Sequence, residues 1–177
     1  MRAYRLDGSD VVAAVLGEWD SFARLNAGAG ALGDRVVGRL LWDMMQGDAT
    51  TAFLERQFYD CRRTQTAAGL LYRCDSPEDE RLFRMRVEPA EHAGLLVSHT
   101  LIRIRPQKPT PLREVGHAHY RKCSQCLSCN FGGPWLEAAR LRLPADAVAV
   151  DAVCPACQAA ASIAQTPDHS ASPAQCG

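Results

Sequence analysis

The chain has 177 residues, of which 47% are hydrophobic, and it carries 20 basic and 20 acidic side chains. This length suits one medium domain with a small appendage, and the composition is sufficient for a buried core. Residues 1–105 carry 14 basic against 15 acidic side chains, and residues 106–177 carry 6 against 5. Because positive charge gathers in neither part, the charge distribution argues against a nucleic-acid-binding surface.

Apolar stretches in this sequence are short. Asp7 interrupts the first of them before it reaches the length of a secretory leader, and no run of about 18 apolar residues occurs. We therefore expect a soluble, cytoplasmic protein with no membrane association. In a reducing cytoplasm, closely spaced cysteine pairs favour metal binding over disulfide formation.

The first predicted element is a buried strand in the β-branched run Val11–Leu16. Asp20 or Ser21 then suits the start of one or two helical turns. Glycines at 28, 30 and 33 indicate a loop, after which residues 36–45 form a short helical piece.

The clearest helix follows Asp48, which is a suitable N-cap, and continues from Thr50 to Thr64 with apolar residues at helical spacing. Turn residues separate the segments beyond it, and alternation of apolar and polar side chains predicts strands with one solvated face. These strands are Ala67–Cys74, Arg81–Glu88 and Leu95–Ile104.

Prolines after residue 105 predict a stiff linker that cannot belong to a central strand. Beyond it, Trp135–Leu143 suits a two-turn helix and Val148–Val153 a short strand, while the polar, alanine-rich end of the chain suits disorder. The domains predicted from these features are 1–106, a linker at 107–120, a cysteine module at 121–160 and a disordered tail at 161–177.

Five cysteines form two groups in the predicted module: Cys123, Cys126 and Cys129, then Cys154 and Cys157. Each C-x-x-C turn can direct two sulfurs at one point, and two such turns at this separation are typical of a tetrahedral structural zinc site. The module has few apolar residues of its own, so bound metal would supply folding free energy. A site filled by four protein ligands has no open position for hydrolytic chemistry.

The predicted order of elements resembles that of a PAS sensory domain: a strand, short helices, a long helix and three antiparallel strands. The segments 19–26 and 36–42 add to this resemblance. The segment Arg73-Cys-Asp-Ser-Pro77, followed by Arg81, is similar to a bacterial subgroup of PAS proteins that also ends in cysteine pairs. The resemblance implies an α+β fold, in which a five-stranded antiparallel sheet carries helices on one face. It also implies a domain that is often dimeric and senses a small ligand or a protein partner.

The same resemblance implies the metal ligands. In the subgroup a C-x-x-C pair is followed by Trp-x-Glu, which matches Trp135-Leu136-Glu137 and gives the set Cys123, Cys126, Cys154 and Cys157. By spacing alone, Cys126 and Cys129 form an equally good pair. His117 and His119 are alternative ligands, although exposed histidines are the simpler interpretation.

Other cofactors have less support in the sequence. An iron–sulfur cluster on the first three cysteines would leave one thiol of the second pair without a role, and a thiol redox switch would use Cys129 as the spare thiol. The helix from Thr50 to Thr64 has no histidine for haem, and Cys61-Arg62 lacks the rest of the flavin-photoreceptor cysteine motif.

Several apolar residues are predicted to form the core rather than a ligand pocket. They are Phe22, Leu41, Trp42, Met45, Phe53 and Phe58. Cys61 and Cys74 are predicted to be inert apolar thiols in the same environment.

No nucleophile constellation, phosphate-binding loop or carboxylate pair occurs at a catalytic spacing, so we do not expect an enzyme. The first hypothesis is a stand-alone PAS-type sensor or adaptor that signals through protein contacts and has a structural zinc site. The alternative is a nucleic-acid-binding or transcription-associated zinc protein on a PAS-like scaffold. The sequence identifies neither the ligand nor the partner.

Overall fold

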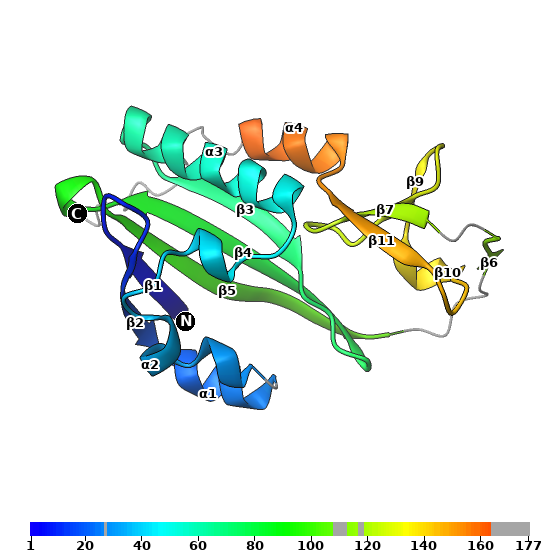
Figure 1. The fold of residues 1–177 in the computed structure, drawn as a ribbon, viewed down its shortest axis with the longest axis horizontal. Coiled ribbons are helices and arrows are strands. Elements are labelled where there is room, and N and C mark those ends of the chain that lie inside the picture. The colour runs from blue at the N-terminus through cyan, green and yellow to red at the C-terminus, as the bar shows by residue number, and fades with distance from the viewer. Residues whose placement is uncertain (27, 108–112, 117–118, 164–177) are drawn as a thin grey trace, which may run out of the picture.

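The computed structural model describes residues 1–26, 28–107, 113–116 and 119–163, and the elements are shown in Figure 1. Residues 164–177 of the predicted disordered tail lie outside the described residues, whereas residues 161–163 are helical, so the prediction is wrong for them. The fold is α+β, with a large antiparallel sheet, helices and a smaller cysteine-bearing part.

Five strands form the large sheet in the order β2-β1-β5-β4-β3, and every neighbouring pair is antiparallel. The sheet confirms the predicted architecture. Its strands are β1 (Arg2–Leu6), β2 (Val12–Gly17), β3 (Ala68–Arg73), β4 (Asp79–Pro89) and β5 (Leu95–Pro106).

The start of the chain differs from the prediction, because two strands replace the single one expected. The Asp7 carboxylate accepts hydrogen bonds from the backbone N–H groups of Ser9 and Val11, and Asp10 has a positive φ of 62°. These contacts form a tight turn that pairs β1 with β2. Asx-type turns of this kind depend on the tertiary pairing as much as on local sequence.

The helices are α1 (Trp19–Leu25), α2 (Gly33–Val36), α3 (Asp48–Thr64) and α4 (Pro155–Ile163), with single 3-10 turns at Ala29–Ala31, Trp42–Met44, Glu91–Ala93 and Ala138–Arg140. α1 places Phe22 edge-on against Phe83, and α3 places Cys61 beside the backbone carbonyl of Val87. Because Phe83 and Val87 point to the same side of β4, α1 and α3 cover the same face of the sheet.

The core lies between that face and the helices. Phe58 of α3 is 1% exposed, and it packs with Leu70, Met85 and Val87 of the sheet. Leu41, Trp42, Met45 and Phe53 pack against this core while partly buried, in agreement with the prediction. None of the described helices is both long and apolar enough to cross a membrane.

The cysteine-bearing part contains a second sheet in the order β11-β7-β8-β9, where β11 and β7 run parallel. Its strands are β7 (His119–Cys123), β8 (Cys129–Asn130), β9 (Trp135–Leu136) and β11 (Val148–Ala152), and β6 (Arg113–Glu114) pairs separately with β10 (Leu141–Arg142).

The predicted helix at Trp135–Leu143 is wrong. Trp135 and Leu136 pair with β8, and residues 141–142 pair with β6. Strand pairing therefore uses the backbone N–H and C=O groups that a helix would need. Only a 3-10 turn at Ala138–Arg140 remains between them. Tertiary pairing outweighs local helix propensity here.

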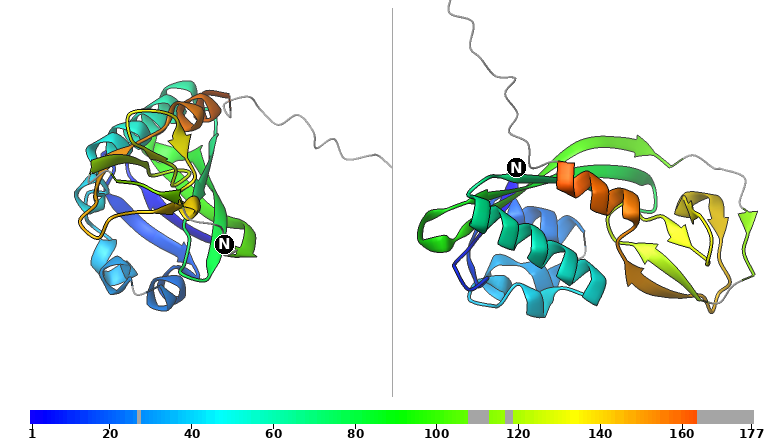
Figure 2. Two further views of the ribbon diagram at one scale, coloured as in Figure 1. Left: turned by 90° about the vertical axis from the view of Figure 1, so that its right-hand side faces the viewer. Right: turned by 90° about the horizontal axis from the view of Figure 1, so that it is seen from above.

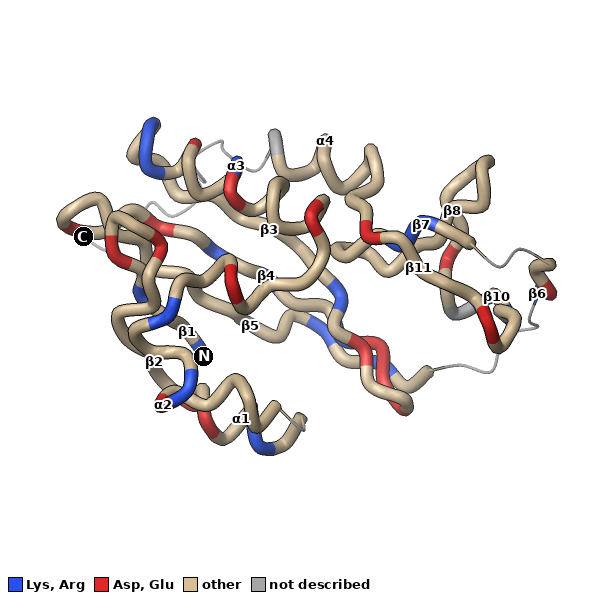
Figure 3. The backbone as a smooth tube through the Cα atoms, viewed as in Figure 1, with Lys and Arg blue, Asp and Glu red and all other residues tan. Residues whose placement is uncertain are grey.

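The two parts of the chain share a core. α4 lies alongside β3, as Figures 1 and 2 show, and its Ala161 is 2% exposed within the core cluster of the large sheet. In the other direction, Phe53 of α3 packs against Cys123 and Cys154. Figure 3 shows acidic and basic residues interspersed over both parts.

The start of α3 also connects the two parts. Gly47, not Asp48, is the N-cap residue, and the cap interaction comes from the carboxylate of Asp151 in β11. This carboxylate accepts hydrogen bonds from the backbone N–H of Thr50 at 2.8 Å and from its hydroxyl at 2.7 Å. A side chain at Gly47, where φ is +93°, would overlap the Asp151 carboxylate. A carboxylate at a helix N-terminus accepts hydrogen bonds from the free N–H groups of the first turn, and its negative charge interacts favourably with the helix dipole.

Replacing Asp151 by Ala should lower the free energy of unfolding by about 1–2 kcal/mol, because the first turn of α3 loses its cap. Urea unfolding monitored by circular dichroism measures this change. Asp146→Ala is the matched control, since Asp146 is exposed. Equal stability of the Asp151 and Asp146 variants would contradict the capping role.

Candidate functional site

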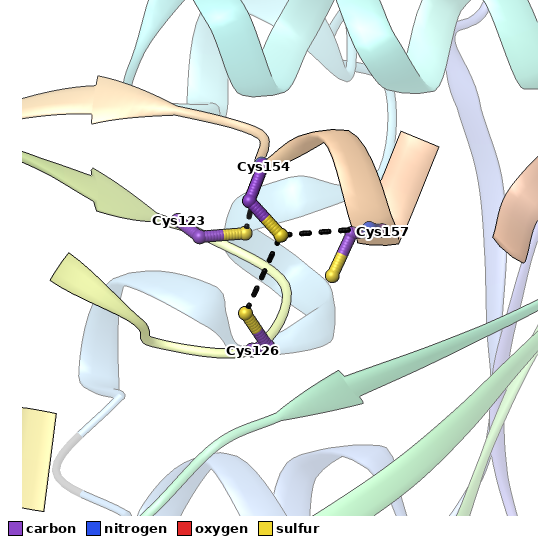
Figure 4. Close-up of side chains that lie close together, drawn as sticks. All are labelled: Cys123, Cys126, Cys154 and Cys157. Carbon is purple, nitrogen blue, oxygen red and sulfur yellow. Dashed lines mark hydrogen bonds between the residues drawn. The ribbon is translucent and has the colours of Figure 1, made fainter. Parts of the chain in front are cut away.

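Four cysteine sulfurs meet where β7, β11 and α4 come together (Figure 4). The Sγ atoms of Cys123, Cys126, Cys154 and Cys157 all lie within 4.8 Å of one another. The set matches the ligands implied by the PAS resemblance.

The local folding that brings the first pair together is a tight turn after β7. The backbone N–H of Leu127 donates to the carbonyl of Cys123 at 2.9 Å, and the N–H of Cys123 donates to the carbonyl of Ser128 at 2.8 Å. Leu127 has a positive φ of 63°, which closes the turn. As a result, Cys123 and Cys126 present their sulfurs to the same point.

The second pair is positioned by the parallel pairing of β7 with β11. Ala152 lies opposite Cys123 in the register, so Cys154 follows two residues later beside the first pair. Pro155 begins α4, where a proline is well tolerated, and Cys157 lies in the first turn. The N–H of Cys154 points to the sulfur of Cys123 at 3.3 Å, and the N–H of Cys157 points to the sulfur of Cys154 at 3.4 Å.

The distances suit a metal better than a disulfide. Cys126 and Cys154 have their sulfurs 3.7 Å apart, and all four cysteines are free thiols. Four sulfurs held about 2.3 Å from a central ion in a tetrahedron are about 3.8 Å apart, whereas bonded sulfurs are about 2.05 Å apart. The cluster therefore has the dimensions of a metal-binding site.

The electrostatic environment of the four sulfurs also favours a bound cation. Burial raises the pKa of the Cys154 thiol and of the Cys157 thiol. Burial acts in the same direction on Cys126, but hydrogen bonds with Ser128, Cys123 and Cys154 together outweigh it and bring the pKa down to about 7. Thiolates are the metal-binding form, and a bound cation compensates the free-energy cost of burying their charge.

Cys129 does not belong to the cluster. It begins β8, is 1% exposed, and has its sulfur 3.8 Å from the carbonyl oxygen of Leu127. His119 is exposed on β7 and is also outside the cluster, whereas His117 lies outside the described residues. The pair Cys126/Cys129 that spacing allowed is thus not the pair that the fold brings to Cys154.

We therefore expect Cys129→Ala to retain bound metal and Cys123→Ala to lose it. Both cysteines are buried, so the two variants remove similar side chains and differ in whether the thiol faces the cluster. Metal content of the purified variants, measured by elemental mass spectrometry, distinguishes them. Loss of metal in the Cys129 variant alone would show that the ligand set is wrong.

The Trp-x-Glu motif has a structural role beside the cluster. Trp135 packs against Cys123 and Cys154, and the carboxylate of Glu137 lies 3.7 Å from the guanidinium of Arg73. Arg73 also pairs with Asp75 of the same strand-to-turn segment. The two motifs that carried the PAS resemblance therefore meet at the junction of the two parts.

A second candidate site is a cavity of about 330 Å³ between α1 and the large sheet. Aromatic side chains line it together with a few polar groups: Arg2, Trp19, Phe22, Tyr72, Phe83 and His99. Phe22 was predicted as core but lines this cavity. Cys74 also lines it and is exposed, so the prediction of a buried thiol at this position is wrong.

His99 is a half-buried ionisable group in the wall of this cavity. Its Nδ1 lies 2.9 Å from the hydroxyl of Tyr72, and its ring stacks on Tyr4 with centroids 5.8 Å apart. Burial, followed by the positive charge of Arg2, lowers the pKa of His99 to about 4. The ring is therefore neutral at physiological pH.

Neither the cavity nor the capping role of Asp151 is predicted from the sequence. The alternating pattern along Leu95–Ile104 puts His99 on one face with Val97, and an inward-pointing histidine could have been predicted from it. No local signal could have linked Asp151 to Thr50, which is 101 residues away.

No family model matches the chain, and no curated protein matches it significantly.

Proposed function

We propose that the chain is a PAS-type sensor or adaptor, which signals through protein contacts and is stabilised by a structural zinc ion. The observation that carries this proposal is the five-stranded antiparallel sheet with helices on one face and a cavity between them. This is the architecture that the PAS resemblance implies. A cavity between helix and sheet gives a small ligand the means to alter helix packing.

Zinc is the metal that the donor set favours. Four cysteine thiolates are a common ligand set of structural zinc sites, and they leave no position for water or substrate. Cys123, Cys126, Cys154 and Cys157 would hold the ion, which would supply folding free energy rather than catalysis. We accordingly propose a non-enzymatic protein.

The route from cavity to partner runs through the junction of the two parts. Tyr72 lines the cavity and precedes Arg73, whose backbone N–H donates to the carbonyl of Gln125 in the cysteine turn at 2.7 Å. A ligand that moves the end of β3 would thus move the loop between Cys123 and Cys126. We propose that surfaces of the cysteine-bearing part contact the partner, or a second copy of the chain.

A thermal-shift screen of a broad metabolite library, with the full chain, tests the sensor function. A compound that stabilises the protein, but not an Ala23→Leu variant in which the buried Ala23 is enlarged to fill the cavity, supports the proposal. Circular dichroism establishes that the variant is folded. Absence of any compound with this behaviour would contradict small-molecule sensing through the cavity.

One observation favours the alternative, a nucleic-acid-binding protein. The pairing of β4 with β5 brings Arg84, Arg86, Arg103 and Arg105 to the face opposite the core, and all four are exposed. Glu80 and Glu88 lie on the same face and reduce its positive potential. Tight DNA or RNA binding that weakens steeply between low and moderate salt would favour this alternative over the sensor.

A further inference from the structure

Arg2 is the cation of the cavity under α1, and aromatic rings hold it in place. Its Cζ lies 3.7 Å from the centroid of the Phe22 ring and 5.0 Å from that of Phe83. It lies opposite His99 in the pairing of β1 with β5, so both side chains project from the same face of the sheet. The rings of Phe22 and Phe83 thus orient the guanidinium at the cavity wall.

This guanidinium has no anionic partner among the described residues. Neither an ion pair nor a hydrogen bond joins the side chain of Arg2 to any residue in the described ranges, although other arginines near the cavity have side-chain partners. Arg81, for example, donates to the side-chain oxygen of Asn26 at 3.0 Å. Glu18 and Arg2 both line an adjoining cavity, but their side chains form no ion pair in the described structure. A partly buried cation without a counter-ion is suited to an anionic ligand.

The positive charge of Arg2 acts on the neighbouring titratable groups. The pKa of Tyr72 is raised by burial, and Arg2 acts against that shift. The charge of Arg2 also helps to keep His99 neutral. Arg2 is therefore the fixed positive charge that faces the aromatic rings.

The other side chains that line the cavity indicate what the uncharged part of the ligand should be. Trp19, Phe22, Tyr72 and Phe83 offer ring faces and edges, and the volume of about 330 Å³ is at the lower end of small-molecule pockets, about 300–1,000 Å³. One guanidinium matches one carboxylate in a bidentate pair, whereas a phosphate group would require more donors. A polar, sugar-like ligand would find few hydrogen-bonding partners there.

We propose that this cavity binds a small aromatic carboxylate, with its ring among these aromatic side chains and its carboxylate paired with Arg2. The proposal rests on the sensor function proposed above and names the chemical class of the ligand. The ligand would complete the ion pair that the chain leaves open.

Calorimetric titration of the full chain with matched pairs of compounds tests this assignment. The probes are benzoate, phenylacetate and indole-3-carboxylate, each compared with its neutral amide. At least one carboxylate should bind about 10- to 100-fold more tightly than its amide, because a hydrogen bond to a charged group contributes that much. Arg2→Met keeps an apolar stem and should reduce this ratio to about one, whereas Arg2→Lys should keep part of it.

Arg5→Met is the matched control, since Arg5 is on the same strand, exposed and on the other face. This variant should bind like the unsubstituted chain. Equal affinity for acid and amide, unchanged binding in Arg2→Met, or no binding of any probe would overturn the carboxylate assignment. If neutral compounds from the library screen still bind in a manner sensitive to Ala23→Leu, the sensor function survives while the ligand class does not.

Discussion

Cys154→Ala should release the metal and unfold the cysteine-bearing part of the chain. Structural zinc contributes apparent binding free energies of about 10–16 kcal/mol in small zinc modules, which exceeds what the few apolar residues of this part can supply. Hydrogen–deuterium exchange should show loss of protection in β7 and β11. Cys129→Ala is the control, because it removes a buried thiol that does not face the cluster.

The effect should reach the large sheet as well. From the sequence, residues 1–106 appear as an independent domain that would remain folded without the module. In the structure, Ala161 is buried in the core of the large sheet and Asp151 caps α3. We therefore expect reduced protection at the start of α3 and along β3 in Cys154→Ala. Retention of metal, or unchanged protection of β11, would contradict the structural role of the cluster.

Acidification should destabilise the chain through His99. Its pKa is about 4 in the folded state and about 6.5 when exposed, so between these values the unfolded state binds more protons. Stability therefore falls as the pH drops from about 7 to 4, and this histidine accounts for about 3 kcal/mol of the loss.

The difference between the unsubstituted chain and His99→Gln isolates this contribution, because the other titrating groups are common to both. Urea unfolding at a series of pH values should show a shallower decline for His99→Gln. His119→Gln, at an exposed histidine, should follow the unsubstituted chain. Parallel curves for the His99 and His119 variants would show that the half-buried imidazole of His99 stays protonated or is solvated.

The sequence predicted those parts of the fold that local pattern determines. Alternation gave β3, β4 and β5 to within a few residues, and helical spacing gave α3. Two C-x-x-C turns and the Trp-x-Glu motif gave the four cysteines that the fold brings together. Periodicity and short-range turns carry this information directly.

The parts of the fold that the sequence did not predict depend on pairing between segments far apart in the chain. Trp135 and Leu136 become a strand because β8 supplies their hydrogen-bonding partners. Asp151 caps α3 only because β11 packs against it, and Arg2 enters the cavity because β1 pairs with β5. Each of these contacts depends on segments far apart in the chain, which propensity and spacing do not record.

Elemental analysis of the purified full chain, combined with its visible absorption spectrum, tests the central claim most directly. A closed site of four thiolates predicts about one zinc ion per chain and no visible absorption. Iron accompanied by inorganic sulfide and a visible chromophore would instead indicate an iron–sulfur cluster. That result, or protein that contains no stoichiometric metal, would contradict the structural zinc centre at Cys123, Cys126, Cys154 and Cys157.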